Sequence, residues 1–222
     1  MELIKREKWG ARPPRNASQL VRKGFVKLHW TVTCVSPGAS VEDECKHMRK
    51  SLQDFHMDTR GWSDVAYNFV VFPSGRVYEG RGLNVRSAAN GGGATNYLHQ
   101  AVALVAGPDC AAQPRQYEAV ASLINTFYRN GVRGHRDGHS TDCPGDDVYQ
   151  WIQDCGWADS LADKGPSYWS WRAWRLGLGP WEGLGRRAQG KRFRPKIPPP
   201  YSPKWPNWWS RLARSQSRKE SV

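Results

Sequence analysis

The sequence lacks any run of about 20 consecutive apolar residues, the length that a helix needs to span a bilayer. Its start, from Met1 to Lys8, is rich in charged side chains and lacks the apolar core of a secretory signal. We therefore expect neither a membrane-spanning protein nor an exported precursor. Synthesis in a cytoplasm is the expected origin of the chain.

Acidic residues are nearly absent from the last quarter of the chain. Residues 166–222 contain 13 Lys or Arg but only two acids, Glu182 and Glu220, whereas residues 1–165 contain 20 Lys or Arg and 18 acids. The same C-terminal segment carries seven of the 12 tryptophans and eight of the 15 prolines. We therefore expect a folded domain over residues 1–163 and a basic, Trp- and Pro-rich tail over residues 164–222.

The chain has only five cysteines, and this odd number argues against a complete disulfide framework. One of the five cysteines fits a metal ligand, as argued below, and four remain. Cys34 and Cys45 are the expected disulfide pair, although a reducing cytosol would oppose the bond until the protein leaves it. Cys110 and Cys155 are expected to be buried thiols.

Hydrophobic periodicity predicts strands and helices that alternate irregularly along the first domain. The expected strands cover residues 25–31, 66–72, 77–79 and 101–106, and the expected helices cover residues 41–57, 114–129 and 148–155. The turn residues Pro73 to Gly75 predict a hairpin between the second and third of these strands. Together the elements predict an α/β fold with a mixed central β-sheet flanked by helices and followed by the basic tail.

A glycine-punctuated loop, Gly134–Gly145, holds two histidines and a cysteine. His135 and Cys143 stand in this loop, and His29 lies in the first expected strand, about a hundred residues earlier. Zinc binds imidazole nitrogen and thiolate sulfur, and three protein ligands leave a fourth position for water, as in hydrolytic sites. The pattern predicts a zinc-dependent hydrolase, with either His135 or His139 as the loop histidine that binds the metal.

Three other features have structural interpretations. The run Gly91–Gly93 lacks the strand-to-helix context of a phosphate-binding loop and predicts a flexible loop. Asp64 and Asp137 are expected to fix their loops by hydrogen bonds and not to act as catalytic acids, and support of a metal ligand is the alternative role for Asp137.

Five motifs, in this order, resemble those of a known enzyme family. They are Lys8–Pro14 (KWGARPP), His29–Thr31 (HWT), Arg60–Phe69 (RGWSDVAYNF), Gly75–Gly82 (GRVYEGRG), and Gly134–Asp137 (GHRD) with Thr141–Gly145 (TDCPG). Together they resemble the zinc-dependent N-acetylmuramoyl-L-alanine amidases of the peptidoglycan-recognition and phage-lysozyme type. The resemblance covers about residues 5–155 and does not extend into the tail.

The resemblance implies a site and a reaction. It implies that His29, His135 and Cys143 are the zinc ligands and that Tyr67 and Thr141 lie close to the metal as catalytic residues. The substrate would be the amide bond between N-acetylmuramic acid and L-alanine in bacterial peptidoglycan. Zinc would activate water and polarise the carbonyl, and the Tyr67 hydroxyl would donate a hydrogen bond to the developing oxyanion. No carboxylate is marked by its spacing as the general base.

The resemblance also implies one disulfide, and the chain departs from the family pattern at two places. Cys34 and Cys45 stand where animal members have a short-loop disulfide. Some phage members have lysine at the position of Thr141, and members often have a histidine in the groove wall where this chain has Ala88–Asn90. The resemblance therefore does not imply a particular substrate preference.

The tail combines seven tryptophans with many arginines. Indole and guanidinium groups suit binding to sugars and to anionic polymers, so we expect the tail to bind an anionic polymer of the cell wall. A solvated, disordered tail would expose these indoles to water. A membrane-surface helix over Trp205–Arg214 is an alternative, and nucleic-acid binding is not expected because only charge supports it.

Taken together, these expectations predict that the protein is a phage endolysin that degrades bacterial peptidoglycan. It would be made in the host cytoplasm without a signal peptide and would act at the cell wall after release. The competing interpretation is a non-catalytic peptidoglycan-binding module, although such members typically lose the cysteine ligand and Cys143 is present. A nucleic-acid-binding protein that acts through its tail is a third interpretation.

Overall fold

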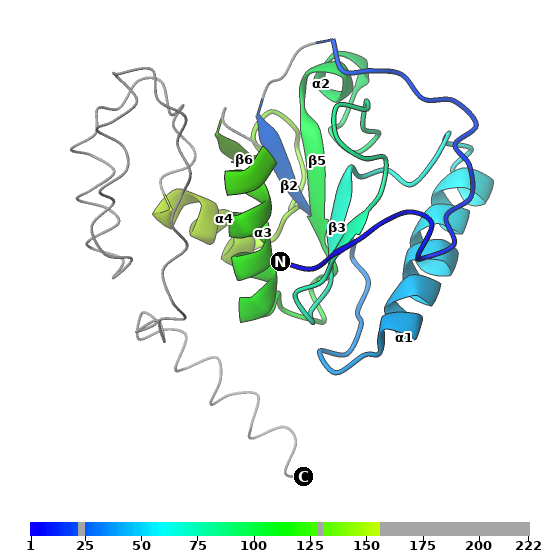
Figure 1. Ribbon diagram of the computed structural model, residues 1–222. Helices are drawn as coiled ribbons and strands as arrows, with labels where there is room; N and C mark the ends of the chain where they lie inside the picture. The colour runs from blue at the N-terminus through cyan, green and yellow to red at the C-terminus, as the bar shows by residue number, and fades with distance from the viewer. Residues whose placement is uncertain (22–24, 128–130, 156–222) are drawn as a thin grey trace, which may run out of the picture. The chain divides into compact units, whose positions relative to one another are not determined.

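The computed structural model describes residues 1–21, 25–127 and 131–155. The expected tail, with the surface helix considered over Trp205–Arg214, lies outside the described residues. In the described part, helices flank a mixed β-sheet (Figure 1), which confirms the predicted α/β fold. Every helix in this part is too short or too polar to span a bilayer.

The sheet has six described strands in the order β1-β4-β3-β5-β2-β6. They are β1 (Leu3–Ile4), β2 (Val26–Trp30), β3 (Phe69–Val71), β4 (Val77–Glu79), β5 (Gln100–Leu104) and β6 (Val132–Gly134). All neighbouring pairs are parallel except β3 and β4, which are antiparallel. The hairpin predicted around Pro73–Gly75 is therefore confirmed as the β3–β4 pair.

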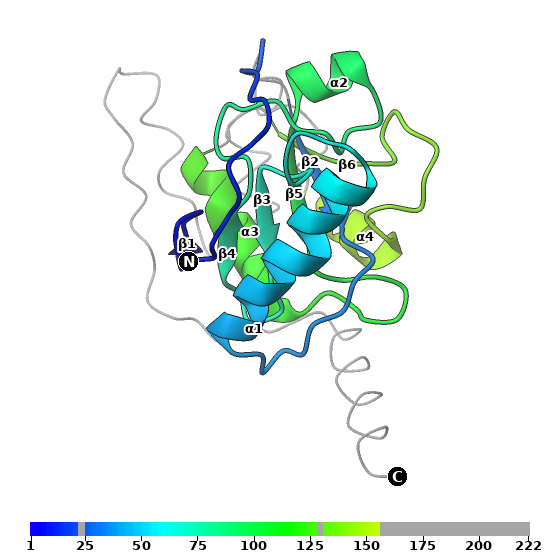
Figure 2. The same ribbon diagram turned by 90° about the vertical axis from the view of Figure 1, so that its right-hand side faces the viewer.

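Helices lie on both sides of this sheet (Figure 2). They are α1 (Val41–Lys46), which continues into the π-helix η1 (His47–Thr59), α2 (Gly93–Leu98), α3 (Pro114–Phe127) and α4 (Asp146–Asp154). The α1–η1 helix lies on one side of the sheet, whereas α3 lies on the other (Figure 2). Helix α3 packs beside α4 through the rings of Tyr117 and Trp151, whose centroids are 4.9 Å apart.

The two central strands are buried along their length. All five residues of β5 and the first four of β2 are buried. Parallel strands that are covered on both faces carry apolar residues at successive positions, because neither face meets water. Apolar and polar residues alternate over residues 26–31 of the sequence, but the polar positions do not form an exposed face. Lys27 is buried, and its ammonium donates to the Asp137 carbonyl at 2.8 Å.

The long helix after β2 begins where its sequence contains a capping box. The Ser40 hydroxyl accepts a hydrogen bond from the Asp43 N–H, and the Asp43 carboxylate accepts one from the Ser40 N–H. Two apolar residues one turn apart, Met48 and Leu52, are buried in the core cluster with Phe72. The helix predicted over residues 41–57 is thus confirmed, and its packing against the sheet fixes one wall of the groove described below.

The short elements were the hardest to predict. Strands β1 and β6 have two and three residues, too few for a hydrophobic period to show. The prediction of a loop over Gly91–Gly93 is wrong at its last residue, because helix α2 begins at Gly93. The Thr95 hydroxyl in this helix donates to the Asn90 and Gly92 carbonyls and so ties the glycine run to the helix.

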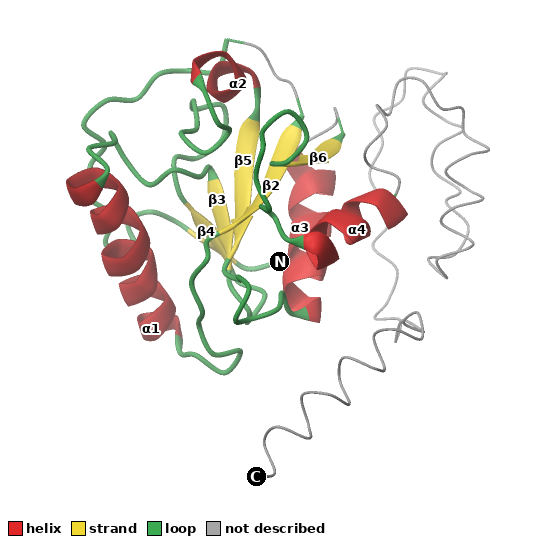
Figure 3. Cartoon of the chain, turned by 180° about the vertical axis from the view of Figure 1, so that it is seen from behind, coloured by secondary structure: helices red, strands yellow, loops and turns green. Residues whose placement is uncertain are grey.

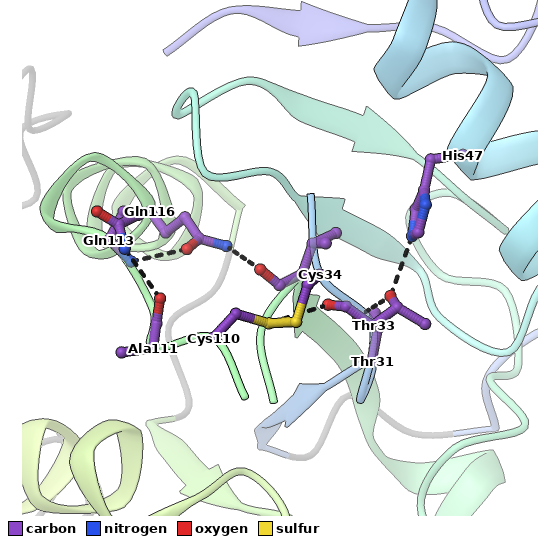
Figure 4. Close-up of a disulfide and its surroundings, with 9 residues drawn as sticks. Thr31, Thr33, Cys34, His47, Cys110, Ala111, Gln113 and Gln116 are labelled. Carbon is purple, nitrogen blue, oxygen red and sulfur yellow. Dashed lines mark hydrogen bonds between the residues drawn. A yellow bond between two sulfur atoms is a disulfide. The ribbon is translucent and has the colours of Figure 1, made fainter. Parts of the chain in front are cut away.

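The disulfide joins Cys34 to Cys110, which corrects the expected Cys34–Cys45 pair (Figure 4). Cys110 is therefore not a buried thiol, whereas Cys45 keeps its thiol, 4.0 Å from the Tyr78 hydroxyl. Cys155 also keeps a thiol and is only half-buried.

The parallel pairing of β2 with β5 explains the observed bond. Trp30 at the end of β2 is in register with Leu104 at the end of β5. The chains that leave these ends stay side by side, since the Val32 N–H donates to the Ala106 carbonyl at 2.9 Å. Cysteines 76 positions apart in the sequence thus meet, whereas a pairing chosen by short sequence distance misses this contact.

Replacing Cys110 by serine is expected to lower the free energy of unfolding by about 4 kcal/mol, because the bond closes a loop of 76 residues in the unfolded chain. Chemical unfolding of the oxidised protein measures the change. The matched control is Cys45→Ser, for which little change is expected. A large loss for Cys45→Ser with none for Cys110→Ser would favour the Cys34–Cys45 bond instead.

Candidate metal centre

The structure brings together His29, His135 and Cys143, the three residues predicted to bind the metal. One potential ligand atom from each lies within 4.8 Å of the other two. The His29 Nδ1 lies 3.6 Å from the Cys143 sulfur, and the centroids of the two imidazole rings are 4.5 Å apart. The arrangement approaches that of a tetrahedral zinc site, in which ligand atoms are about 3.5 Å apart.

Two neighbouring parallel strands carry the histidines to one edge of the sheet. His29 is the fourth residue of β2, and His135 directly follows β6. The two strands pair in parallel, and the His135 N–H donates to the Leu28 carbonyl. Figure 3 shows β2 and β6 side by side with α4 nearby. Since parallel strands end at the same edge, residues at their carboxyl ends meet there.

Hydrogen bonds hold the loop that carries Cys143. The Asp137 carboxylate accepts from the Gly134 N–H at 2.8 Å and from the Tyr149 hydroxyl at 2.7 Å. The Arg136 N–H donates to the Cys143 carbonyl, which closes the loop on itself. The prediction that Asp137 fixes its loop is confirmed, and so is the same prediction for Asp64, whose Oδ1 accepts from the Gln53 side chain and the Val65 N–H.

A glycine is required where this loop returns to β2. Gly145 has a φ of 87°, in the left-handed region that side chains disfavour. A Cβ atom at this position would also lie 2.5 Å from the Trp30 ring. The close approach lets the Trp30 N–H reach the Cys143 sulfur at 3.4 Å.

Both imidazoles are neutral near pH 7. Burial and then the neighbouring His135 lower the pKa of His29 to about 3. Burial and then His139 lower the pKa of His135 to about 4. Neutral imidazole is the form that binds a metal, because it keeps a lone pair on one ring nitrogen.

The Cys143 thiol is protonated in the absence of a metal. Burial raises the pKa of Cys143 to about 11, while the hydrogen bond from the Trp30 N–H acts in the opposite direction. A metal would bind the thiolate and release this proton, as zinc does at cysteine ligands.

One atom at the cluster tests whether the residues fit a metal. The Nε2 atom of His135 is buried and has no hydrogen-bond partner among the described residues. An unpaired buried polar group costs about 1–3 kcal/mol, and a bound cation would remove that cost. Two imidazoles and one thiolate are typical zinc donors, and three of them leave a fourth position open.

His139 lies beside the cluster and not in it. Its ring stacks on that of His135, with centroids 4.9 Å apart and planes 10° apart, and its side chain is exposed. The sequence left open whether His135 or His139 is the candidate ligand. The structure places His135, and not His139, next to His29 and Cys143.

The cluster opens into a groove of about 990 Å³. Tyr67 and Thr141, the predicted catalytic residues, both line it with the three clustered side chains. The ring centroid of Tyr67 is 5.7 Å from that of His29, and its hydroxyl lies 3.5 Å from the Trp30 carbonyl. Burial and the neighbouring Cys143 raise the pKa of Tyr67, so its hydroxyl stays protonated and able to donate.

Thr141 is hydrogen-bonded to the backbone of Cys143, one of the three candidate metal ligands. Its hydroxyl oxygen accepts a hydrogen bond from the Cys143 N–H at 3.2 Å. The hydroxyl hydrogen is then available to a molecule in the groove, since Thr141 also lines that groove.

Several groove residues could not be identified from the sequence pattern. Helix η1 and the loop after it supply His56 and Trp62, whose rings stack at 5.1 Å, and the guanidinium of Arg60 lies over the Phe55 ring. These residues come from a π-helix and an irregular loop, so no regular period marks the face that they share. The presence of Trp62 within the RGW motif was the one available signal.

The chain is similar to known proteins over its described part. Residues 22–146 match the family model Amidase_2, N-acetylmuramoyl-L-alanine amidase. Mouse peptidoglycan recognition protein 1 is 32% identical over 162 residues, which cover 68% of this chain and 86% of that protein. Human N-acetylmuramoyl-L-alanine amidase is 34% identical over 159 residues, but the match spans only 27% of its length. The chain belongs to the N-acetylmuramoyl-L-alanine amidase family.

Solved structures of peptidoglycan recognition proteins share the fold. Wild-type Drosophila PGRP-LB has a TM-score of 0.62 and 26% identity, with 73% of this chain and 99% of that chain covered. A variant of Drosophila PGRP-LB in complex with tracheal cytotoxin has a TM-score of 0.60 and 28% identity, with 68% and 92% covered. The family thus includes proteins named for hydrolysis and proteins named for recognition.

Proposed function

We propose that the protein is a zinc-dependent N-acetylmuramoyl-L-alanine amidase. It would hydrolyse the amide bond that joins N-acetylmuramic acid to L-alanine in bacterial peptidoglycan. The observation that carries this proposal is the convergence of His29, His135 and Cys143 beside a groove, in a chain of the amidase family. The family match alone is insufficient, because the relatives include recognition proteins.

The proposed reaction assigns a role to each residue at the groove. His29, His135 and Cys143 would hold zinc, which supplies a Lewis acid that activates water and polarises the amide carbonyl. The protonated Tyr67 hydroxyl would donate a hydrogen bond to the carbonyl oxygen as it gains negative charge. The Thr141 hydroxyl would orient the substrate or the attacking water by the hydrogen that it does not use on the backbone.

The charges of the groove suit an anionic peptide. Arg60 and Arg86 line it, and none of the described lining residues is Asp or Glu. The stem peptides of peptidoglycan carry carboxylates, which guanidinium groups bind well. The same lack of acids means that the lining contains no carboxylate to act as a general base.

A non-catalytic peptidoglycan-binding protein is the second candidate function. The relatives named peptidoglycan recognition proteins, and a solved relative in complex with tracheal cytotoxin, favour binding. Binding alone would not require the buried thiol of Cys143 next to two neutral imidazoles. The complete donor set is the reason to prefer hydrolysis.

Purified peptidoglycan incubated with the zinc-loaded protein is expected to release new L-alanine amino termini, which amino-group labelling measures. Chelation of zinc or the change Cys143→Ala is expected to abolish release, because either removes the Lewis acid from the groove. Cys45→Ala is the matched control, since this thiol is not part of the donor cluster, and it should keep full activity. Wall binding by the zinc-loaded protein without any release would favour the recognition function instead.

The change Tyr67→Phe is expected to lower kcat by about 10²–10³-fold, since it removes one hydrogen-bond donor to the oxyanion. KM and zinc content should change little, because the ring is retained. Tyr117→Phe is the control on helix α3, where the ring packs on Trp151 away from the groove. A kcat for Tyr67→Phe within twofold of wild type would contradict the assigned role.

The proposal extends to the tail and to the place of action. The basic, Trp-rich segment over residues 164–222 would bind an anionic wall polymer and so hold the enzyme on its substrate. A phage endolysin, made in the host cytoplasm and active at the wall after release, is the setting that combines this tail with an amidase domain.

A chain ending at Asp163 is expected to keep its activity on soluble muropeptides but to bind whole cell walls more weakly than the full chain. The difference should shrink as salt rises, because salt screens the attraction between basic residues and an anionic polymer. Co-sedimentation with purified walls at low and high salt measures it. Equal sedimentation of the two chains at low salt would remove the anchoring role.

A further inference from the structure

We propose that Asn90 is a positioning residue for the metal centre: its side-chain oxygen accepts a hydrogen bond from the Nε2–H of His29 and so presents Nδ1 of His29 to the metal. This inference rests on the proposed function, since the metal is the zinc of that site. Asn90 belongs to the stretch Ala88–Asn90 that departs from the family pattern.

The two nitrogens of His29 face different partners. Nε2 lies 2.9 Å from Oδ1 of Asn90, and Nδ1 lies 3.6 Å from the sulfur of Cys143. His29 is 2% exposed and Asn90 is 1% exposed, so water does not compete for this hydrogen bond. Nδ1 is therefore the ring nitrogen that faces Cys143, while Nε2 is engaged by Asn90.

The neighbours of Asn90 determine which way its amide points. Its Nδ2 lies 2.8 Å from the His99 carbonyl oxygen and 2.9 Å from the Ser87 hydroxyl. A carbonyl can only accept, so the amide nitrogen must face His99 and the amide oxygen must face His29. The Asn90 oxygen carries no hydrogen, and the hydrogen of this bond therefore belongs to Nε2 of His29. Neutral His29 then has its lone pair on Nδ1.

Asn90 is itself held by the wall of the groove. Its N–H donates to Oδ1 of Asn96 at 2.8 Å, and its carbonyl accepts from the Thr95 hydroxyl at 2.8 Å. The Ser87 hydroxyl also donates to Oδ1 of Asn96, at 3.1 Å. A buried polar network in which the members satisfy one another is rigid. The start of α2 therefore fixes the orientation of a candidate metal ligand.

A hydrogen-bonded neighbour of this kind tunes a metal ligand in two ways. It fixes the tautomer and the ring orientation of the histidine, and it raises the basicity of the nitrogen that binds the metal. Loss of such a partner typically weakens metal binding by about 10–100-fold. A purely structural role for Asn90 would change stability without selecting a tautomer of His29.

The first test observes the wild-type chain without metal. Two-dimensional ¹H–¹⁵N NMR of the full chain, with His29 assigned by comparison with His29→Gln, reports which ring nitrogen carries the hydrogen. The inference predicts the Nε2–H tautomer for His29. The Nδ1–H tautomer would overturn it, and this result does not depend on the folding of any Asn90 variant.

The second test measures zinc affinity by competition with a chelator. Asn90→Leu has a similar volume but no acceptor, and it is expected to bind zinc about 10–100-fold more weakly than wild type. Asn16→Leu, at an exposed asparagine, is the control and should bind zinc like wild type. Melting curves of the metal-free chains identify any loss caused by unfolding.

The outcomes separate the two proposals. Zinc binding by wild type with an unchanged affinity in folded Asn90→Leu would overturn the role of Asn90 and leave the amidase proposal intact. A wild-type chain that binds no zinc would overturn both. Weaker zinc binding in a folded Asn90→Leu chain, together with the Nε2–H tautomer in wild type, supports the inference.

Discussion

The parallel pairing of β2 with its two neighbours is the constraint on which the rest of the structure depends. The β2–β6 pair places His29 and His135 at one edge of the sheet. The β2–β5 pair carries the chain beyond Trp30 alongside the chain beyond Leu104, where Cys34 meets Cys110. The registers of β2 with its two neighbours therefore determine both the geometry of the candidate metal centre and the pairing of Cys34 with Cys110.

Burial gives the centre its chemistry. The same packing that buries His29 and half-buries His135 keeps both imidazoles neutral, and it keeps the Tyr67 hydroxyl protonated. Neutral imidazoles bind a metal, and a protonated phenol donates to an oxyanion. The Nε2 atom of His135 has no described partner, whereas Nε2 of His29 is hydrogen-bonded to Asn90, so the two histidines differ in their surroundings although the same ligand role is proposed for both.

The sequence could predict what local patterns encode. The helix after Ser40, the β3–β4 hairpin and helix α3 follow from periodicity and turn residues, and the three clustered donors follow from their motifs. The disulfide could not be predicted, because it depends on the register of β2 with β5. The role of Asn90 also required coordinates, since its amide orientation is set by a carbonyl nine positions later in the chain.

Zinc K-edge X-ray absorption spectroscopy of the zinc-loaded full chain tests the central claim most directly, because it reads the donor atoms at the metal. The account predicts one zinc per chain with one sulfur at about 2.3 Å and two imidazole nitrogens at about 2.0–2.1 Å, plus one further light atom. A coordination shell without sulfur, or a protein that retains no zinc, would contradict the assignment of Cys143, His29 and His135 as a catalytic metal centre.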